Sequence, residues 1–144
     1  MPLPEPRRGL VISHAYLWHH EHLAGREEAR KHRPCVIVLA IENPTGGHPI
    51  VLVAPVTHSM PENPAAAFEL PRAVNRHLGL DDERSWVILD QVNRFQWPGF
   101  DLRPISPSGD RFTHGFLPPR LFDQLMVKLR AVWTASPGKT ISRD

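Results

Sequence analysis

Two polar segments, each next to an apolar run, carry the residue types that phosphodiester chemistry needs. Arg33 precedes one run, and Thr57, His58 and Ser59 follow the next. Arginine offers a fixed planar charge, hydroxyls offer short hydrogen bonds, and imidazole changes protonation near neutral pH. Gathered around one point, these groups suit a phosphorus centre that gains negative charge during a reaction. The alternative is an exposed ion pair among ordinary polar residues at strand ends.

Whether the two segments meet depends on the turn between them. Asn43–His48 contains two consecutive glycines, which accept the positive φ of a tight hairpin turn, and it separates two apolar runs of similar length. A hairpin at this place makes the two runs adjacent antiparallel strands. The turn therefore predicts that Arg33 and residues 57–59 lie at the same end of a sheet.

Sixteen prolines divide the chain into short pieces and disfavour long helices in its middle. The predicted strands are the apolar runs rich in β-branched residues, Leu10–Leu17, Cys35–Ile41, Ile50–Val56, Ala67–Leu70, Trp86–Val92 and Arg111–Leu117. A short helix is predicted at about 71–78 and a longer one at about 119–133, where apolar residues recur every three or four positions. These elements predict a mainly β fold with minor α content, a small SH3-like half-open barrel of about five to seven strands.

A chain of 144 residues has the size of one ordinary domain. We expect a single domain over residues 1–136 and a flexible tail over residues 137–144. The longest strictly apolar run is Cys35–Ile41, far short of the roughly 20 residues that cross a bilayer. The protein is therefore expected to be cytoplasmic and to have no membrane partner.

The charge balance is compatible with nucleic acid binding but does not establish it. The formal net charge is only +2, yet most of the 17 basic residues are arginines, whose planar fork suits bidentate contact with phosphate. A single cysteine excludes an intramolecular disulfide. Folding is therefore expected to rely on packing alone.

The other reactive side chains point to no cofactor. The cluster of His19, His20, Glu21 and His22 lacks the spacing of a helical zinc motif, which favours exposed loop histidines over the alternative of a metal site. Cys35 lies inside an apolar run, which indicates a buried thiol and not a nucleophile. The sequence also lacks the glycine motifs that cradle nucleotide phosphates. We expect neither a metal nor a cofactor.

A further pattern covers most of the chain. It consists of five segments in order: the opening strand Gly9–Ile12, then HRPCVIVLA, LVAPVTHS, WVILDQV and the closing GFLPPRLFDQLMVKLRAV. Together these segments resemble the MazF/PemK family of type II toxin–antitoxin endoribonucleases. The resemblance implies a PemK-like half-open barrel and a sequence-selective, metal-independent toxin that inhibits growth. Such a toxin cleaves single-stranded RNA through attack of the 2′-hydroxyl on the phosphodiester. A cognate antitoxin and a homodimer are the implied partners.

The same resemblance implies roles for individual residues. Arg33 falls on the catalytic arginine of the family, Thr57 on its catalytic hydroxyl, and Ser59 in the adjoining polar turn. Asp90 and Gln91 fall on a DQ pair, for which we expect either substrate contact or the positioning of loops around the groove.

Three further residues complete the predicted site. His58 stands where the family often has a small polar residue, and its imidazole is the candidate for the acid or base. Arg94 is a candidate for a phosphate contact. Trp97, in a predicted turn, is the aromatic residue that we expect to be exposed as a platform for an unpaired base. Ile88 stands where some members carry a second arginine, so that contribution is missing here.

A non-catalytic binding module derived from the same small barrel is the main alternative to an enzyme. The two hypotheses differ in whether Arg33 and Thr57 share an open groove or are buried or blocked by the segment His19–Lys31. A metal-dependent hydrolase that uses the histidine cluster is a third possibility.

Overall fold

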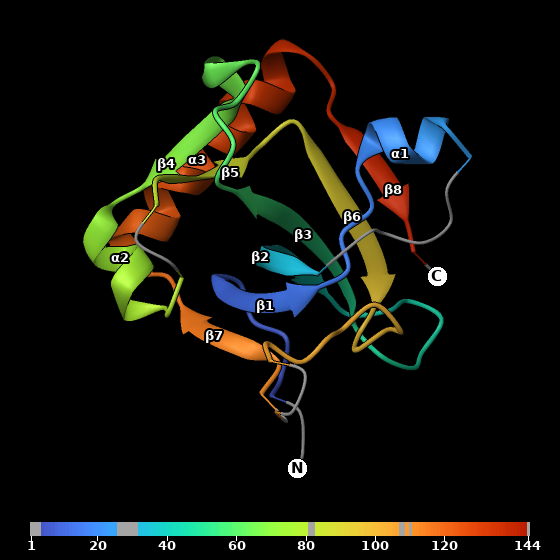
Figure 1. The fold of residues 1–144 in the computed structure, drawn as a ribbon. Coiled ribbons are helices and arrows are strands. Elements are labelled where there is room, and N and C mark those ends of the chain that lie inside the picture. The colour runs from blue at the N-terminus through green and yellow to red at the C-terminus, as the bar shows by residue number, and fades with distance from the viewer. Residues whose placement is uncertain (1–3, 26–31, 81–82, 107–108, 110, 144) are drawn as a thin grey trace.

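The computed structural model describes residues 4–25, 32–80, 83–106, 109 and 111–143. These residues contain eight strands, three α-helices and one 3-10 helix. The strands are β1 (Leu10–His14), β2 (Arg33–Ile41), β3 (Ile50–Thr57), β4 (Ala67–Leu70), β5 (Ser85–Ile88), β6 (Gln91–Gln96), β7 (Thr113–Phe116) and β8 (Lys139–Ser142). The helices are α1 (His19–Leu23), η1 (Pro64–Ala66), α2 (Arg72–His77) and α3 (Pro119–Ala135). Figure 1 shows the strands curled around a common centre, with α3 behind β4 and β5.

The central strand of the sheet is β3. On one side it pairs antiparallel with β2, and its other side is shared by β6 beside Ile50–Val53 and by β5 beside Val56 and Thr57. A register shift in β2 between Ile37 and Leu39 adds a bend, because an irregular pairing increases the local twist of a sheet. The strands follow the order β4-β5-β3-β2-β1-β7, and β6 and β8 extend from β3. The predicted mainly β, half-open barrel is confirmed, with eight strands in place of five to seven.

The predicted hairpin is confirmed. Gly46 and Gly47 lie in the turn between β2 and β3 with φ of 85° and 89°, and the two strands run antiparallel with Cys35 opposite Pro55. The same register, continued by two residues toward the open end of the hairpin, places Arg33 opposite Thr57, the last residue of β3. The turn therefore places the two polar segments side by side.

Both predicted helices are confirmed. The short helix α2 follows Pro71 and is closed by Gly79, whose φ of 69° suits the end of a helix. The long helix α3 buries Phe122 and Leu125 against the sheet. None of the described helices is long and apolar enough to cross a membrane.

The predicted strand Trp86–Val92 is wrong, because the chain breaks there into β5 and β6. In addition, β6 continues to Gln96, where the sequence predicts a turn. The strand β6 continues because Asn93, which favours turns by its residue type, is buried inside it with its side chain hydrogen bonded. Its side-chain oxygen accepts a hydrogen bond from the backbone N–H of Leu17 at 2.9 Å, and its amide donates to the carbonyl of Leu17 at 2.8 Å. A residue type that favours turns is thus satisfied within a strand.

The residues expected to form a flexible tail are paired instead. Lys139–Ser142 form β8, which runs parallel to β6 and buries Ile141. Just beyond it, Arg143 donates to Asp101 through Nε at 2.8 Å and Nη2 at 3.2 Å, and both side chains are buried. This contact joins residues far apart in the sequence, so the local composition of the tail does not indicate it.

Candidate functional site

A cavity of about 550 Å³ lies at the open end of the β2–β3 hairpin. Six of the eight predicted site residues line it, namely Arg33, Thr57, His58, Ser59, Asp90 and Gln91. Trp18 and His20, from the start of α1, contribute one wall. The structure therefore brings together most of the residues that the sequence singled out, while the chemical role of each stays a prediction.

Arg33 is the first residue of β2 and lines the cavity beside an aromatic ring. Its guanidinium carbon lies 4.8 Å from the centre of the Trp18 ring, a cation–π contact. Burial lowers the pKa of Arg33 from its ordinary value, although the nearby Cys35 and Glu21 oppose that shift. Its Nε is buried and has no hydrogen-bond partner among the described residues. The guanidinium of Arg33 is thus partly buried beside Trp18 at the edge of the cavity.

The α1 segment is held beside Arg33 by Gln91. The side-chain oxygen of Gln91 accepts hydrogen bonds from the backbone N–H of His19 at 3.0 Å and from the hydroxyl of Tyr16 at 3.3 Å. Because this oxygen is engaged at the start of α1, Gln91 positions a wall of the cavity. The described part of the segment His19–Lys31 thus borders the cavity that Arg33 lines.

Thr57 ends β3 with its hydroxyl held in a defined orientation. The Oγ1 atom accepts a hydrogen bond from the backbone N–H of Ser59 at 3.1 Å. This contact occupies an acceptor site of the hydroxyl and leaves its proton available for donation. Thr57 is therefore placed to donate to an oxygen of a ligand in the cavity.

His58 follows Thr57 and is oriented by the backbone. Its Nδ1 lies 3.3 Å from the carbonyl oxygen of Arg84, so in the neutral ring Nδ1 carries the proton and Nε2 is the basic nitrogen. Arg84 is itself fixed, since it donates to both carboxylate oxygens of Glu69 at 2.9 and 2.8 Å and packs over the Trp86 ring. The backbone at Arg84 thus helps to orient the ring of His58.

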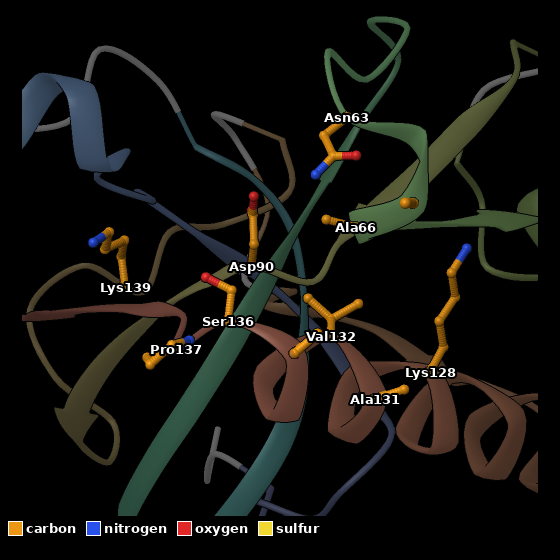
Figure 2. A pocket seen from close by; sticks show the side chains of 11 residues that line it. Asn63, Ala66, Asp90, Lys128, Ala131, Val132, Ser136, Pro137 and Lys139 are labelled. Carbon is orange, nitrogen blue, oxygen red and sulfur yellow. The ribbon is translucent and has the colours of Figure 1, made fainter.

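Asp90 stands between this cavity and a second one of about 540 Å³. The second cavity lies between η1 and the end of α3, and Figure 2 shows Asp90 and Asn63 pointing into the space above Val132. The backbone around Asp90 is held by C-terminal residues. The indole N–H of Trp133 donates to the carbonyl of Leu89 at 2.6 Å, and the N–H of Lys139 donates to the carbonyl of Asp90 at 2.9 Å.

Two predicted site residues lie elsewhere. Arg94 is in β6 opposite Leu52 and does not line the cavity. Trp97 is only 6% exposed and packs with Tyr16 and Phe95, so the prediction of an exposed stacking platform is wrong. The tryptophan at the cavity is Trp18, one of several aromatic residues that the sequence offers as a platform for a base.

The other reactive side chains are candidates for a metal site and for a nucleophilic thiol. No group of three or more His, Cys, Asp or Glu side chains in the described residues is arranged to hold a metal ion. Cys35 is buried, as predicted, and burial raises the pKa of its thiol. An inert core cysteine is the result.

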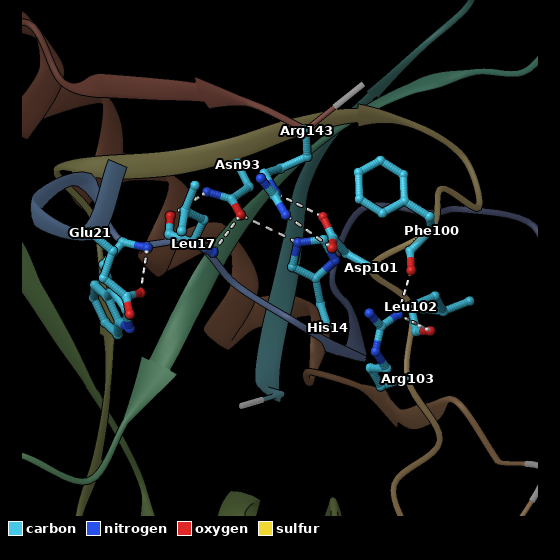
Figure 3. A network of polar contacts seen from close by, with 10 residues as sticks. His14, Leu17, Glu21, Asn93, Phe100, Asp101, Leu102, Arg103 and Arg143 are labelled. Carbon is cyan, nitrogen blue, oxygen red and sulfur yellow. Dashed lines mark hydrogen bonds and ion pairs between the residues drawn. The ribbon is translucent and has the colours of Figure 1, made fainter. Parts of the chain in front are cut away.

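A buried polar network lies apart from the cavity, around His14. Figure 3 shows His14, Asn93, Asp101 and Arg143 close together. The Nε2 of His14 is 3.4 Å from the Oδ1 of Asn93, and the ring stacks on Phe95 with centroids 4.8 Å apart. Burial lowers the pKa of His14 to about 4, although the charge of Asp101 opposes the shift. The folded protein therefore keeps this imidazole neutral.

Acidification is expected to destabilise the fold through His14. Between the ordinary pKa of 6.5 and the folded value of about 4, the unfolded chain takes up a proton that the folded chain does not. The free energy of unfolding then falls as the pH falls, by about 3 kcal/mol at pH 4 relative to pH 7. Urea titrations at both pH values measure this loss. In His14→Gln we expect the free energy of unfolding to fall less between these pH values, the difference from the wild type being about that amount. The control His77→Gln, at an exposed position, is expected to behave as the wild type. Equal losses in all three proteins would contradict the assignment.

Comparison with known proteins adds one finding. The sequence model of one protein family, described as the PemK-like, MazF-like toxin of type II toxin-antitoxin systems, matches residues 16–132. No curated protein and no solved structure matches the chain. The matched segment covers more than half of the chain and contains every residue of the cavity described around Arg33, whereas β8 lies beyond it.

Proposed function

The chain belongs to the PemK-like, MazF-like toxins of type II toxin-antitoxin systems, and we propose that it is a sequence-selective, metal-independent endoribonuclease that cleaves single-stranded RNA and so inhibits growth. The observation that carries the proposal is that Arg33, Thr57 and His58 line one cavity. A phosphate bound there accepts hydrogen bonds from the arginine and the hydroxyl and has the imidazole beside it.

In the proposed reaction the 2′-oxygen of RNA attacks the adjacent phosphorus and the bond from phosphorus to the 5′-oxygen breaks. The products are a 2′,3′-cyclic phosphate and a 5′-hydroxyl. DNA lacks the attacking hydroxyl and is not a substrate. The site has three tasks: to accept the 2′ proton, to neutralise the charge that develops on the phosphorus oxygens, and to protonate the leaving 5′-oxygen.

The three candidate catalytic side chains divide these tasks by their chemistry. His58 accepts the 2′ proton, as the imidazole that lines the cavity beside Thr57. Arg33 binds the non-bridging oxygens, and Thr57 donates its hydroxyl proton to one of them. The leaving 5′-oxygen takes its proton from the imidazolium or from Arg33, whose pKa is lowered by burial and whose guanidinium is then pressed against a dianionic phosphorane.

The remaining cavity residues bind the substrate or hold the site. Ser59 lies in the turn after Thr57 and is exposed to a bound strand. Asp90 offers a carboxylate to the N–H groups of a base. Gln91 acts by positioning α1, given its contacts with that segment. Arg94 and Trp97 are not assigned a contact with the substrate.

A non-catalytic binding module is the alternative to the enzyme. That hypothesis expects Arg33 and Thr57 to be buried or blocked by the segment His19–Lys31, whereas an enzyme needs both in one open groove. Both residues line one cavity, which supports the enzyme, while residues 26–31 of that segment lie outside the described residues. The remaining partners follow from the family: a cognate antitoxin, a second copy of the chain in a homodimer, and an RNA substrate in the cytoplasm.

Incubation of the purified protein with a mixed RNA pool tests the proposal. We expect cleavage at preferred sequences, equally with and without EDTA, leaving cyclic phosphate and 5′-hydroxyl ends that sequencing of the termini maps. A matched pool of the same sequences made as DNA is the control and stays intact. Loss of all cleavage in EDTA would show that the reaction needs a metal. An intact RNA pool under all conditions would favour the binding module.

A further inference from the structure

We propose that the second cavity, between η1 and α3, is a nucleotide subsite that receives the RNA residue next to the cleaved bond. This inference rests on the proposed function, because the subsite is for the nucleotide next to a phosphate that Arg33 binds. It commits to one chemical class of occupant, a nucleobase with N–H donors on its Watson–Crick edge together with the attached phosphate.

The second cavity lies directly beside the first. The two share Asn63, Ala66 and Asp90 in their linings, so a nucleotide next to the cleaved bond lies within reach of the second cavity. The second cavity holds about 540 Å³, within the range of about 300–1,000 Å³ typical of ligand sites. A single nucleotide therefore has room beside the phosphate site.

The lining of the second cavity combines an apolar wall with polar groups at its edge. One wall is made of small apolar side chains, among them Ala66, Ala131 and Val132, which leave space for a flat ring to pack against them. The edge of the cavity carries the carboxylate of Asp90 and the amide of Asn63, both directed into the same space in Figure 2. An apolar face with a few polar groups at its edge is the arrangement that binds an unstacked base.

The carboxylate of Asp90 selects among the bases. Guanine presents two parallel N–H donors, N1–H and the 2-amino group, to a single carboxylate, whereas uracil presents one N–H between two carbonyl acceptors. We therefore expect guanine to be favoured over uracil in the subsite. Two lysines add the charge that a phosphate requires. Lys128, whose ammonium group donates to the carbonyl of Ala67 at 2.5 Å, is fixed in place, and Lys139 is exposed at the rim.

Several residues of the subsite lie outside the family match. Ala135, Ser136, Pro137 and Lys139 all line the cavity, and the match ends at residue 132. The pairing of β8 with β6 holds these residues beside Asp90. The C-terminal segment of this chain therefore adds a second binding surface to a site that the family sequence already contains.

The test measures binding without cleavage. Wild-type protein is titrated by NMR with a 2′-O-methyl dinucleotide, which blocks the attacking hydroxyl, and with trinucleotides extended by guanosine or uridine at either end. We expect guanosine at one end to lower the Kd about tenfold, as for one stacked base, and uridine to lower it less. Asp90→Asn is expected to remove the difference between the two bases.

Variants locate the effect. Ala131→Trp fills the cavity from an exposed helix position and is expected to abolish the gain from the third nucleotide while leaving dinucleotide binding intact. Thr134→Trp, on the same helix but not lining the cavity, is the control and keeps the gain. Lys139→Glu is expected to reduce the gain and its salt dependence, and Arg130→Glu, an exposed charge on α3 outside the cavity, to preserve both.

The outcomes separate this inference from the proposed function. A gain from the third nucleotide that survives in Ala131→Trp, or no gain in the wild type, overturns the subsite even if the protein cleaves RNA. A gain that Ala131→Trp abolishes and Thr134→Trp retains supports the subsite. This support holds even if the RNA pool stays intact, a result that counts against the nuclease alone.

Discussion

Arg33→Lys is expected to slow RNA cleavage by about 10²–10³-fold although it keeps the positive charge. Arg33 stacks on Trp18 and holds a buried Nε that no described residue satisfies. Lysine has no planar fork, so it cannot bridge two phosphate oxygens in one plane. The measurement is kcat/KM on an RNA of a sequence mapped in the pool experiment.

The matched control for this substitution is Arg120→Lys, which changes an exposed arginine at the start of α3. We expect this control to cleave at the wild-type rate. Thermal unfolding of both variants checks that neither substitution unfolds the protein. A fully active, folded Arg33→Lys would remove Arg33 from the reaction and leave the cavity without its proposed phosphate ligand.

His58→Ala is the second large effect that we expect, a loss of about 10²–10⁴-fold in cleavage rate, the usual value of one general acid or base. Imidazole is the side-chain group that changes protonation between about pH 5 and 8. If His58 accepts the 2′ proton, the wild-type rate rises with pH, because only the neutral ring is a base. The variant should lose this rise. Rates measured at saturating and at low RNA concentrations across the range give both profiles.

Thr57→Val separates proton transfer from hydrogen bonding. The substitution removes the hydroxyl that Ser59 N–H orients but adds no titrating group. We expect slower cleavage with an unchanged pH profile, since a threonine hydroxyl does not ionise in this range. If instead His58→Ala keeps the wild-type profile, the proton moves through Arg33 or water, and His58 is an ordinary residue beside the cavity.

The sequence predicted the parts of the structure that local chemistry determines. The turn Asn43–His48 predicted the hairpin, and the hairpin alone brings Arg33 next to Thr57. The apolar repeat after Pro119 predicted α3. In each case the signal lies within a few neighbouring residues, where glycine conformations or helical periodicity act directly.

The parts that the sequence did not predict depend on contacts between distant segments. Asn93 favours a turn by its residue type, but its amide is satisfied by the backbone of Leu17 and the strand continues through it. Trp97 follows that strand into the core, and the aromatic wall of the site is formed by Trp18 instead. No local pattern indicates which of several aromatic residues a distant segment will cover.

The pairing of β8 with β6 limits how far this chain can be shortened. The family match ends at residue 132, yet residues beyond it cover the edge of β6, and Arg143 neutralises the buried Asp101. A chain cut at that boundary has an open strand edge, which favours pairing between copies, and a buried carboxylate without its cation. We therefore expect a chain cut at the boundary of the match to be less stable, and more prone to association through the edge of β6, than the full chain.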